Sequence, residues 1–106
     1  MARALIHMPA QAKRGEVIEI RALIAHPMET GYRPGADGRI LQRDIIRRFT
    51  CRYGDTVVFE AELHPAIAAN PYIAFHTTAT ESGTLTFTWQ GDHGFAQTET
   101  MPLAVT

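Results

Sequence analysis

The sequence has little of several features that would point directly to a function. Its 106 residues include one cysteine, Cys51, so no internal disulfide can form. The formal net charge is −1 and no block of like charge occurs, which argues against nucleic acid or an acidic membrane surface as a partner. No apolar run approaches the ~20 residues of a membrane-spanning helix. The first residues also lack the continuous apolar segment of a secretory signal, so the chain by itself is expected to stay where it is made.

What the sequence does contain is a clear alternation of period two. In residues 82–94, Leu85, Phe87 and Trp89 alternate with threonines, the pattern of a strand with one buried and one solvent-facing side. Turn-forming residues precede and follow this run. We therefore expect a strand whose large apolar side chains fill a core.

The same alternation recurs along the chain, while no long helical period occurs. Residues 66–69 are expected to form one helical turn, because Pro71 prevents its continuation. About seven short strands with regular turn signals predict an all-β fold, an antiparallel β-sandwich of the immunoglobulin type. The length is that of a single domain, spanning residues 1–106. The expected strands lie within residues 3–8, 16–26, 45–53, 57–63, 72–79, 82–94 and 95–105.

The hairpin expected over residues 45–63 allows a prediction of its register. The apolar residues of both strands are odd-numbered, so the numbers of opposed residues must sum to an even number if these side chains are to share a face. A three-residue loop over 53–55, with Gly54 at positive φ, satisfies this condition. It places Arg48 opposite Glu60 as an exposed ion pair.

The residues that could carry chemistry do not form a recognisable motif. Cys51 falls on the core face of its strand, where a thiol packs as a small hydrophobe with a raised pKa. A small redox or thiol-dependent module acting through Cys51 remains the alternative function. Neither HxH nor HxxxH spacing occurs, and there is no CxxC, so neither a metal site nor another cofactor is expected. The five histidines are His7, His26, His64, His76 and His93.

Two features of the sequence indicate a surface that contacts another protein. Residues 26–39 form a long loop rich in proline and glycine, in which Met28 and Tyr32 are side chains of the kind that anchor interfaces. Ile46 and Val58 fall on the solvent face of the hairpin beside arginines, as an apolar patch suited to docking another protein. These four residues are the candidate interface with a partner. An unremarkable surface is the competing interpretation.

Four blocks of sequence carry a family resemblance. They are AHPMETGYR at 25–33, IIRRFTCRYG at 45–54, LHPAIAANPYIAF at 63–75 and SGTLTFTWQGDHG at 82–94. In this order, and over nearly the whole length, they resemble the SoxZ family, the smaller subunits of the SoxYZ carrier complexes of bacterial sulfur oxidation.

The resemblance implies an immunoglobulin-like fold and a scaffold role without catalysis. SoxZ proteins pair with SoxY, in a heterodimer open to further assembly. The C-terminal Gly-Gly-Cys-Gly-Gly arm of SoxY carries sulfur intermediates of thiosulfate oxidation to a c-type Sox cytochrome, a thiol hydrolase and a sulfane dehydrogenase. Cys51 has no flanking glycines, so the resemblance implies that the carrier thiol belongs to SoxY.

The resemblance also implies a location. Similar family members act in the periplasm and are carried there already folded, bound to a partner that has a twin-arginine signal. We therefore expect a periplasmic protein that is co-exported with SoxY, through a largely apolar interface of at least ~1,200 Å². A free-standing ligand-binding sandwich, active without a second subunit, is a third interpretation.

Overall fold

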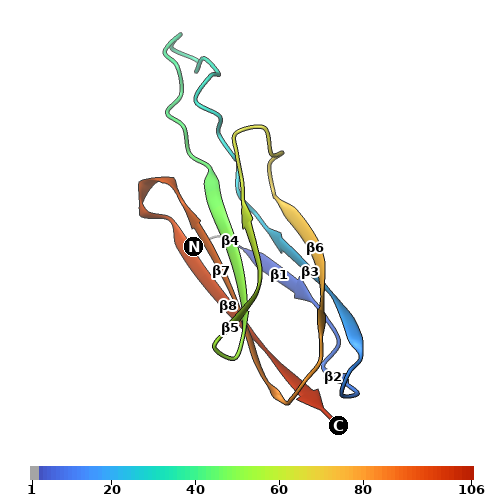
Figure 1. Cartoon of the computed structure of the whole chain (residues 1–106). Coiled ribbons are helices and arrows are strands. Elements are labelled where there is room, and N and C mark those ends of the chain that lie inside the picture. The colour runs from blue at the N-terminus through green and yellow to red at the C-terminus, as the bar shows by residue number, and fades with distance from the viewer. Residues whose placement is uncertain (1–2) are drawn as a thin grey trace.

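The computed structural model describes residues 3–106 and contains two β-sheets that face each other (Figure 1). The smaller sheet has the order β1-β3-β6, and the larger has the order β2-β8-β7-β4-β5. Strand β2 pairs with β8 in parallel, and the other pairs are antiparallel. The strands are β1 (Ala4–His7), β2 (Gln11–Ala12), β3 (Val17–Ile24), β4 (Ile46–Tyr53), β5 (Thr56–Glu62), β6 (Tyr72–Thr78), β7 (Gly83–Gly91) and β8 (Ala96–Val105).

The predicted β-sandwich is confirmed, and the strands number eight over the described residues, where about seven were expected. The additional one is β2, a two-residue strand within a segment whose sequence shows no alternation. Its pairing with Ala104 and Val105 of β8 depends on residues far away in the chain. Local pattern therefore could not reveal it.

The core lies between the two sheets and is filled by the alternating residues. Trp89, Phe49 and Phe87 are the largest fully buried side chains. Burial of each such side chain stabilises the fold by about 1.5–3 kcal/mol. The rings of Phe59 and Phe75 stack at 4.4 Å between centroids and join β5 of the larger sheet to β6 of the smaller. The expected burial of Leu85, Phe87 and Trp89 on β7 is thus confirmed. On β3 every second residue, from Ile18 to Ile24, is buried in the same way.

The hairpin of β4 and β5 reaches its register by a different route from the predicted one. Tyr53 pairs with Thr56 across a two-residue turn, so the predicted three-residue loop is wrong, although Gly54 does have a positive φ of 58°. A β-bulge then inserts Val58 as an extra residue, which returns the register to even sums. The even sums, which place the apolar side chains of both strands on one face, are therefore produced by the bulge rather than by the loop.

The same bulge changes two further predictions for this hairpin. Val57, expected in the core, is exposed, because the residues next to the turn have the odd register. Arg48 lies opposite Glu62 rather than Glu60. Its guanidinium nevertheless reaches diagonally to the carboxylate of Glu60, so the predicted ion pair forms.

A second bulge explains why Ile46 is fully buried where the sequence predicts a solvent-facing position. Ile46 pairs with Gly91 and Arg48 pairs with Gln90, so Arg47 is the extra residue and points outward. The chain can pass this closely because position 91 is glycine. A Cβ there would lie 2.5 Å from the carbonyl oxygen of Ile45.

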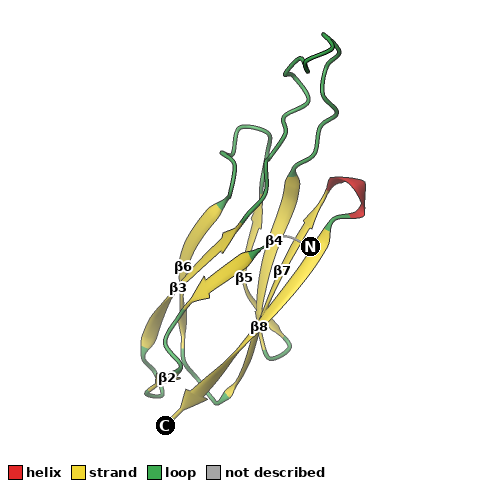
Figure 2. Cartoon of the chain, turned by 180° about the vertical axis from the view of Figure 1, so that it is seen from behind, coloured by secondary structure: helices red, strands yellow, loops and turns green. Residues whose placement is uncertain are grey.

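The segment between β5 and β6 contains no helix, contrary to the helical turn expected over 66–69. The Ile67 N–H instead donates to the carbonyl oxygen of His64 at 2.9 Å, which closes a β-turn. The five residues between Pro65 and Pro71 are too few to nucleate a helix. The segment lies at the same end of the sandwich as the connection from β3 to β4 (Figure 2).

The molecule is elongated, with principal extents of 58 × 20 × 19 Å. Much of its length comes from the connection between β3 and β4, which extends well beyond the end of the sheets (Figure 1). Within residues 3–106 the structure holds no helix of the length and apolar character that crossing a membrane requires.

Candidate functional site

The most distinctive feature of the surface is this projecting connection, residues 27–44, here called the arm. Its two limbs pair at Glu29 with Asp44 and again at Pro34 with Ile40. At the first of these pairs both backbone N–H groups donate to the opposite carbonyl oxygen at 2.8 Å. The long loop predicted from the sequence is therefore an extended, two-limbed arm.

Met28 and Ile46, both predicted to anchor a partner, lie together inside the base of the arm. Met28 is only 4% exposed and belongs to the hydrophobic core, and Ile46 is fully buried. The Ile46 N–H donates to the Met28 sulfur at 3.2 Å. The expectation that they are exposed is wrong. The bulge at Arg47 turns Ile46 inward, and the flexible Met28 side chain packs among the other buried core residues. They hold the arm in place from inside.

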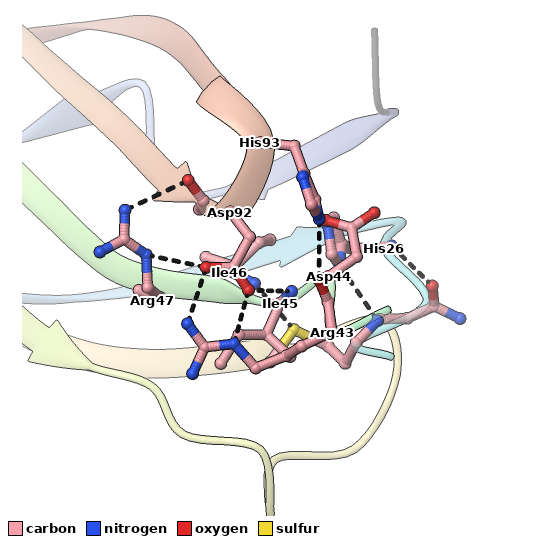
Figure 3. A network of polar contacts seen from close by, with 11 residues as sticks. His26, Arg43, Asp44, Ile45, Ile46, Arg47, Asp92 and His93 are labelled. Carbon is pink, nitrogen blue, oxygen red and sulfur yellow. Dashed lines mark hydrogen bonds and ion pairs between the residues drawn. The ribbon is translucent and has the colours of Figure 1, made fainter. Parts of the chain in front are cut away.

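His26 joins three segments at the same base. Its Nδ1 accepts the Met28 N–H at 3.0 Å, and its own backbone N–H donates to the Asn70 side-chain oxygen at 3.0 Å. The imidazole is buried, packs edge-on against Phe95 at 5.2 Å between centroids, and places Nε2 3.7 Å from a carboxylate oxygen of Asp44. Figure 3 shows this ring beside the polar contacts that follow.

Asp92 is the first residue of the short 3-10 helix η1 (Asp92–Gly94), which connects β7 to β8, and it fastens the returning limb of the arm (Figure 3). It accepts two hydrogen bonds from the Arg43 guanidinium, at 2.9 and 3.0 Å, and one from the Ile45 N–H at 3.1 Å. Arg47 adds an ion pair at 3.2 Å, and the neighbouring His93 ring donates to the Arg43 carbonyl oxygen at 2.8 Å. Burial opposes ionisation of Asp92, but the Arg43 and Ile45 hydrogen bonds and the two cations prevail and lower its pKa.

Beyond this base the arm exposes large apolar side chains. Tyr32 is 80% exposed, as expected of an interface residue, and Ile40 on the opposite limb is exposed as well. Sequence reasoning missed Ile40, although an aliphatic residue inside a polar, glycine-rich loop was the available signal. The nearby Glu29 and Arg33 form an ion pair at 2.6 Å. A well-anchored projection with an apolar surface is suited to contact another protein.

Val58 does not join the other three predicted interface residues. It is half-buried on β5 and packs against the core. It also lines a polar groove at the opposite end of the sandwich, together with Tyr53 and Thr80. The four predicted residues therefore form no single patch: two are buried in the base of the arm, one is on the arm and one is at the far end.

Cys51 is fully buried on β4, as its position in the alternating pattern of that strand predicts. Burial raises the pKa of its thiol to about 12, which is unfavourable for the alternative function as a thiol-dependent module. Over the part of the chain that the structure describes, no three His, Cys, Asp or Glu side chains gather closely enough to hold a metal ion.

Solved structures of other proteins have the same fold and establish the fold class. A superoxide reductase (neelaredoxin) from Ignicoccus hospitalis superposes with a TM-score of 0.77 at 16% identity, covering 99% of this chain and 82% of that one. The sulfur carrier protein SoxY from Chlorobium limicola f. thiosulfatophilum superposes with a TM-score of 0.67 at 13% identity, covering 97% and 78%. At such identities the likeness concerns the fold alone. The chain is a β-sandwich of this immunoglobulin-like and superoxide-reductase-like type.

The sequence places the chain within that class more closely. The family model described as sulphur oxidation protein SoxZ matches residues 6–102. The chain belongs to the SoxZ family and is a component of Sox sulfur oxidation, which confirms the resemblance seen in its four sequence blocks. No curated protein matches the sequence.

Proposed function

We propose that this protein is the non-catalytic subunit of a SoxYZ carrier complex in thiosulfate oxidation. In this role it binds SoxY and positions it so that the cysteine arm of SoxY can reach successive Sox enzymes. The family match over residues 6–102 is the observation on which the proposal depends. Burial of Cys51 supports it, because a carrier thiol must enter the active sites of other proteins and this thiol is enclosed by its own core.

The arm is the part of this chain best suited to contact SoxY. Its base is fixed by Asp92, His26 and Met28, so little conformational entropy is lost when its exposed surface is covered. Tyr32 and Ile40 supply apolar area there. The c-type cytochrome, the thiol hydrolase and the sulfane dehydrogenase would then meet the complex transiently, while SoxY presents the sulfur cargo.

We further propose a periplasmic location, reached by export of the folded pair on a signal carried by SoxY. Fractionation of the native host tests this. The chain is expected in the periplasm of the wild type and in the cytoplasm when the twin-arginine signal of the partner is deleted. A periplasmic chain in the deletion strain would contradict co-export.

Isolation of the protein from its native host, followed by intact mass spectrometry, tests the carrier assignment. SoxY is expected to accompany this chain, and the sulfur adducts are expected on SoxY. Adducts on Cys51, with turnover that requires them, would overturn the proposal and support the thiol-dependent alternative.

The arm is tested by the double variant Tyr32→Ala/Ile40→Ala. Because both side chains are exposed, the melting temperature should not change, while the affinity for SoxY should fall by roughly 10-fold or more. Val57→Ala, which removes an exposed apolar side chain at the far end of the sandwich, is the control. Equal affinities of the double variant and the wild type, measured by titration calorimetry, would exclude the arm from the interface.

A further inference from the structure

The three-stranded sheet exposes a row of apolar side chains on its outer face. Leu5 of β1 lies opposite Leu23 of β3, and Leu23 lies opposite Tyr72 of β6, so the three form one row across the sheet. Leu5 is 54% and Tyr72 58% exposed, and Leu23 is half-buried. The outer positions of an antiparallel sheet are normally polar. This row is therefore unusual for a face that meets only water.

The five-stranded sheet provides the comparison within the same molecule. Its outer face on β4 and β7 carries paired polar residues, with Thr50 opposite Thr88 and Arg52 opposite Thr86. That face has the ordinary composition of a solvated surface. Of these two faces, as compared here, the smaller sheet's is the one with an apolar row across it, which favours the smaller sheet as the docking face.

Two shallow grooves meet at this row. One is lined by Leu5, Leu23 and Tyr72 together with His7 and Arg21. The other is lined by Leu5 and Leu23 together with Arg3, Ala25 and Asn70. Since both grooves share the two leucines, side chains of a partner can pack on either side of them.

The second groove leads to the arm. Asn70, which lines this groove, accepts the His26 N–H at the base of the arm. The apolar row also lies at the end of the sheet from which the arm departs, because Leu23 is the last residue but one of β3. The row therefore lies beside the base of the arm, and the row and the exposed arm residues together are here called the sheet–arm surface, made by Leu5, Leu23, Tyr72, Tyr32 and Ile40.

The rim of the row carries basic side chains. Arg3, Arg21 and His7 line the grooves. The nearest acidic group on β3, Glu19, is already paired with Arg21 at 2.7 Å and lies 3.7 Å from His76. Because Glu19 already neutralises Arg21, the net positive charge at the rim comes from Arg3, and a complementary partner would have an apolar centre with an acidic group facing Arg3.

The size of the surface indicates what kind of partner covers it. The three strands have four, eight and seven residues. At ~3.3 Å per residue and ~4.8 Å between strands they give a sheet face of roughly 300 Å² in projection. A stable interface buries at least about 600 Å² on each partner. The sheet face alone is too small, and the arm supplies the remaining area. The partner must therefore span both, which requires a folded domain rather than a short peptide.

We propose that SoxY docks on the sheet–arm surface, with its sandwich against the Leu5–Leu23–Tyr72 row and its flank against the arm. This proposal rests on the proposed function, since it takes SoxY as the partner. The SoxY of Chlorobium limicola is itself a sandwich that superposes on 97% of this chain, so it has the size that the surface requires.

The test is a titration of SoxY from the same organism into the full-length chain. The double variant Leu5→Glu/Tyr72→Glu places two charges in the row and should weaken binding by roughly 100-fold. Val17→Glu is the matched control: Val17 is on the same sheet and 62% exposed, but it lies at the opposite end of β3. Its affinity should stay within about threefold of wild type. If circular dichroism shows that the glutamate pair unfolds the chain, Leu5→Ser/Tyr72→Ser is titrated in its place, with the same expectation.

The outcomes separate the two proposals. Wild-type chain that does not bind SoxY refutes the proposed function. Wild-type binding that is retained in the folded row variants leaves that function intact and overturns the docking face. Sedimentation equilibrium of the chain alone tests whether a second copy of this chain occupies the face instead. Self-association that the row variants abolish, with SoxY binding unchanged, would assign the face to that second copy and would also overturn the proposal.

Discussion

At the scale of single residues, the buried position of Cys51 disfavours the thiolate form, which is the reactive one. Its thiol has a pKa of about 12, so at pH 8 about one molecule in 10⁴ holds a thiolate. Iodoacetamide should therefore label the native protein at least ~100-fold more slowly than the unfolded protein. Peptide mass spectrometry measures this directly, and rapid labelling of the native protein would contradict it.

The functional counterpart is Cys51→Ser. If this protein is a scaffold, the variant should support unchanged thiosulfate oxidation in the reconstituted pathway, since the sulfur cargo would be carried on SoxY. Loss of turnover with an intact complex would show that the buried thiol takes part in the chemistry.

Asp92 has the opposite character, because its charge stabilises the fold. Its pKa lies below the usual 3.8, so its contribution to stability is complete above that value and is lost as the pH falls through the lowered folded-state pKa. At pH 7, Asp92→Asn should lower the free energy of unfolding by about 1 kcal/mol, a modest effect because the guanidinium groups are half exposed and screened.

Denaturant melts at a series of pH values measure this effect. The difference between wild type and Asp92→Asn should be constant above about pH 5 and should shrink toward zero in acid. Asp37→Asn, which changes an exposed aspartate on the arm, is the control and should match wild type throughout. A difference that persists unchanged to low pH would mean that the charge of Asp92 is not the cause.

At the scale of elements, the arm is predicted to be stiff at its base although it projects into solvent. The amides of Glu29 and Asp44 donate to each other's carbonyls at 2.8 Å, and Asp92 fixes the limb beside them. Hydrogen exchange should show both amides protected, and Asp92→Ala should speed their exchange by roughly 10-fold. Exchange in the variant as slow as in wild type would show that the backbone pairing alone holds the arm.

The elements also show where local pattern is sufficient and where it is not. Alternation identified β3 and β7 because every second residue of these strands meets the core without interruption. It failed for Ile46 and Val57, where a bulge shifts the count by one residue. Bulges are settled by the neighbouring strand, such as the close approach that Gly91 permits, and leave no periodic signature.

At the scale of the whole molecule, SoxY should stabilise the fold by mass action if it binds this chain as proposed. SoxY at 100 times its dissociation constant adds about 2.7 kcal/mol to the free energy of unfolding. For a domain of this size such a gain raises the melting temperature by roughly 10–20 °C. Scanning calorimetry with and without SoxY measures the shift.

The same calorimetric measurement on variants of the sheet–arm surface tests where SoxY binds. Val17→Glu should retain the shift in melting temperature, and Leu5→Glu/Tyr72→Glu should lose most of it. A shift that is the same in all three proteins would place SoxY elsewhere on the sandwich.

The sequence by itself determined the β class, the core faces of β3 and β7, the burial of Cys51 and membership of the SoxZ family, because alternation and family motifs are properties of neighbouring residues. Only the tertiary structure decided that Met28 is enclosed at the base of the arm, and that Leu5, Leu23 and Tyr72 form one exposed row. Each of these depends on which distant strands pair and in which register. That choice is made by packing of the whole chain, and no stretch of it encodes the answer alone.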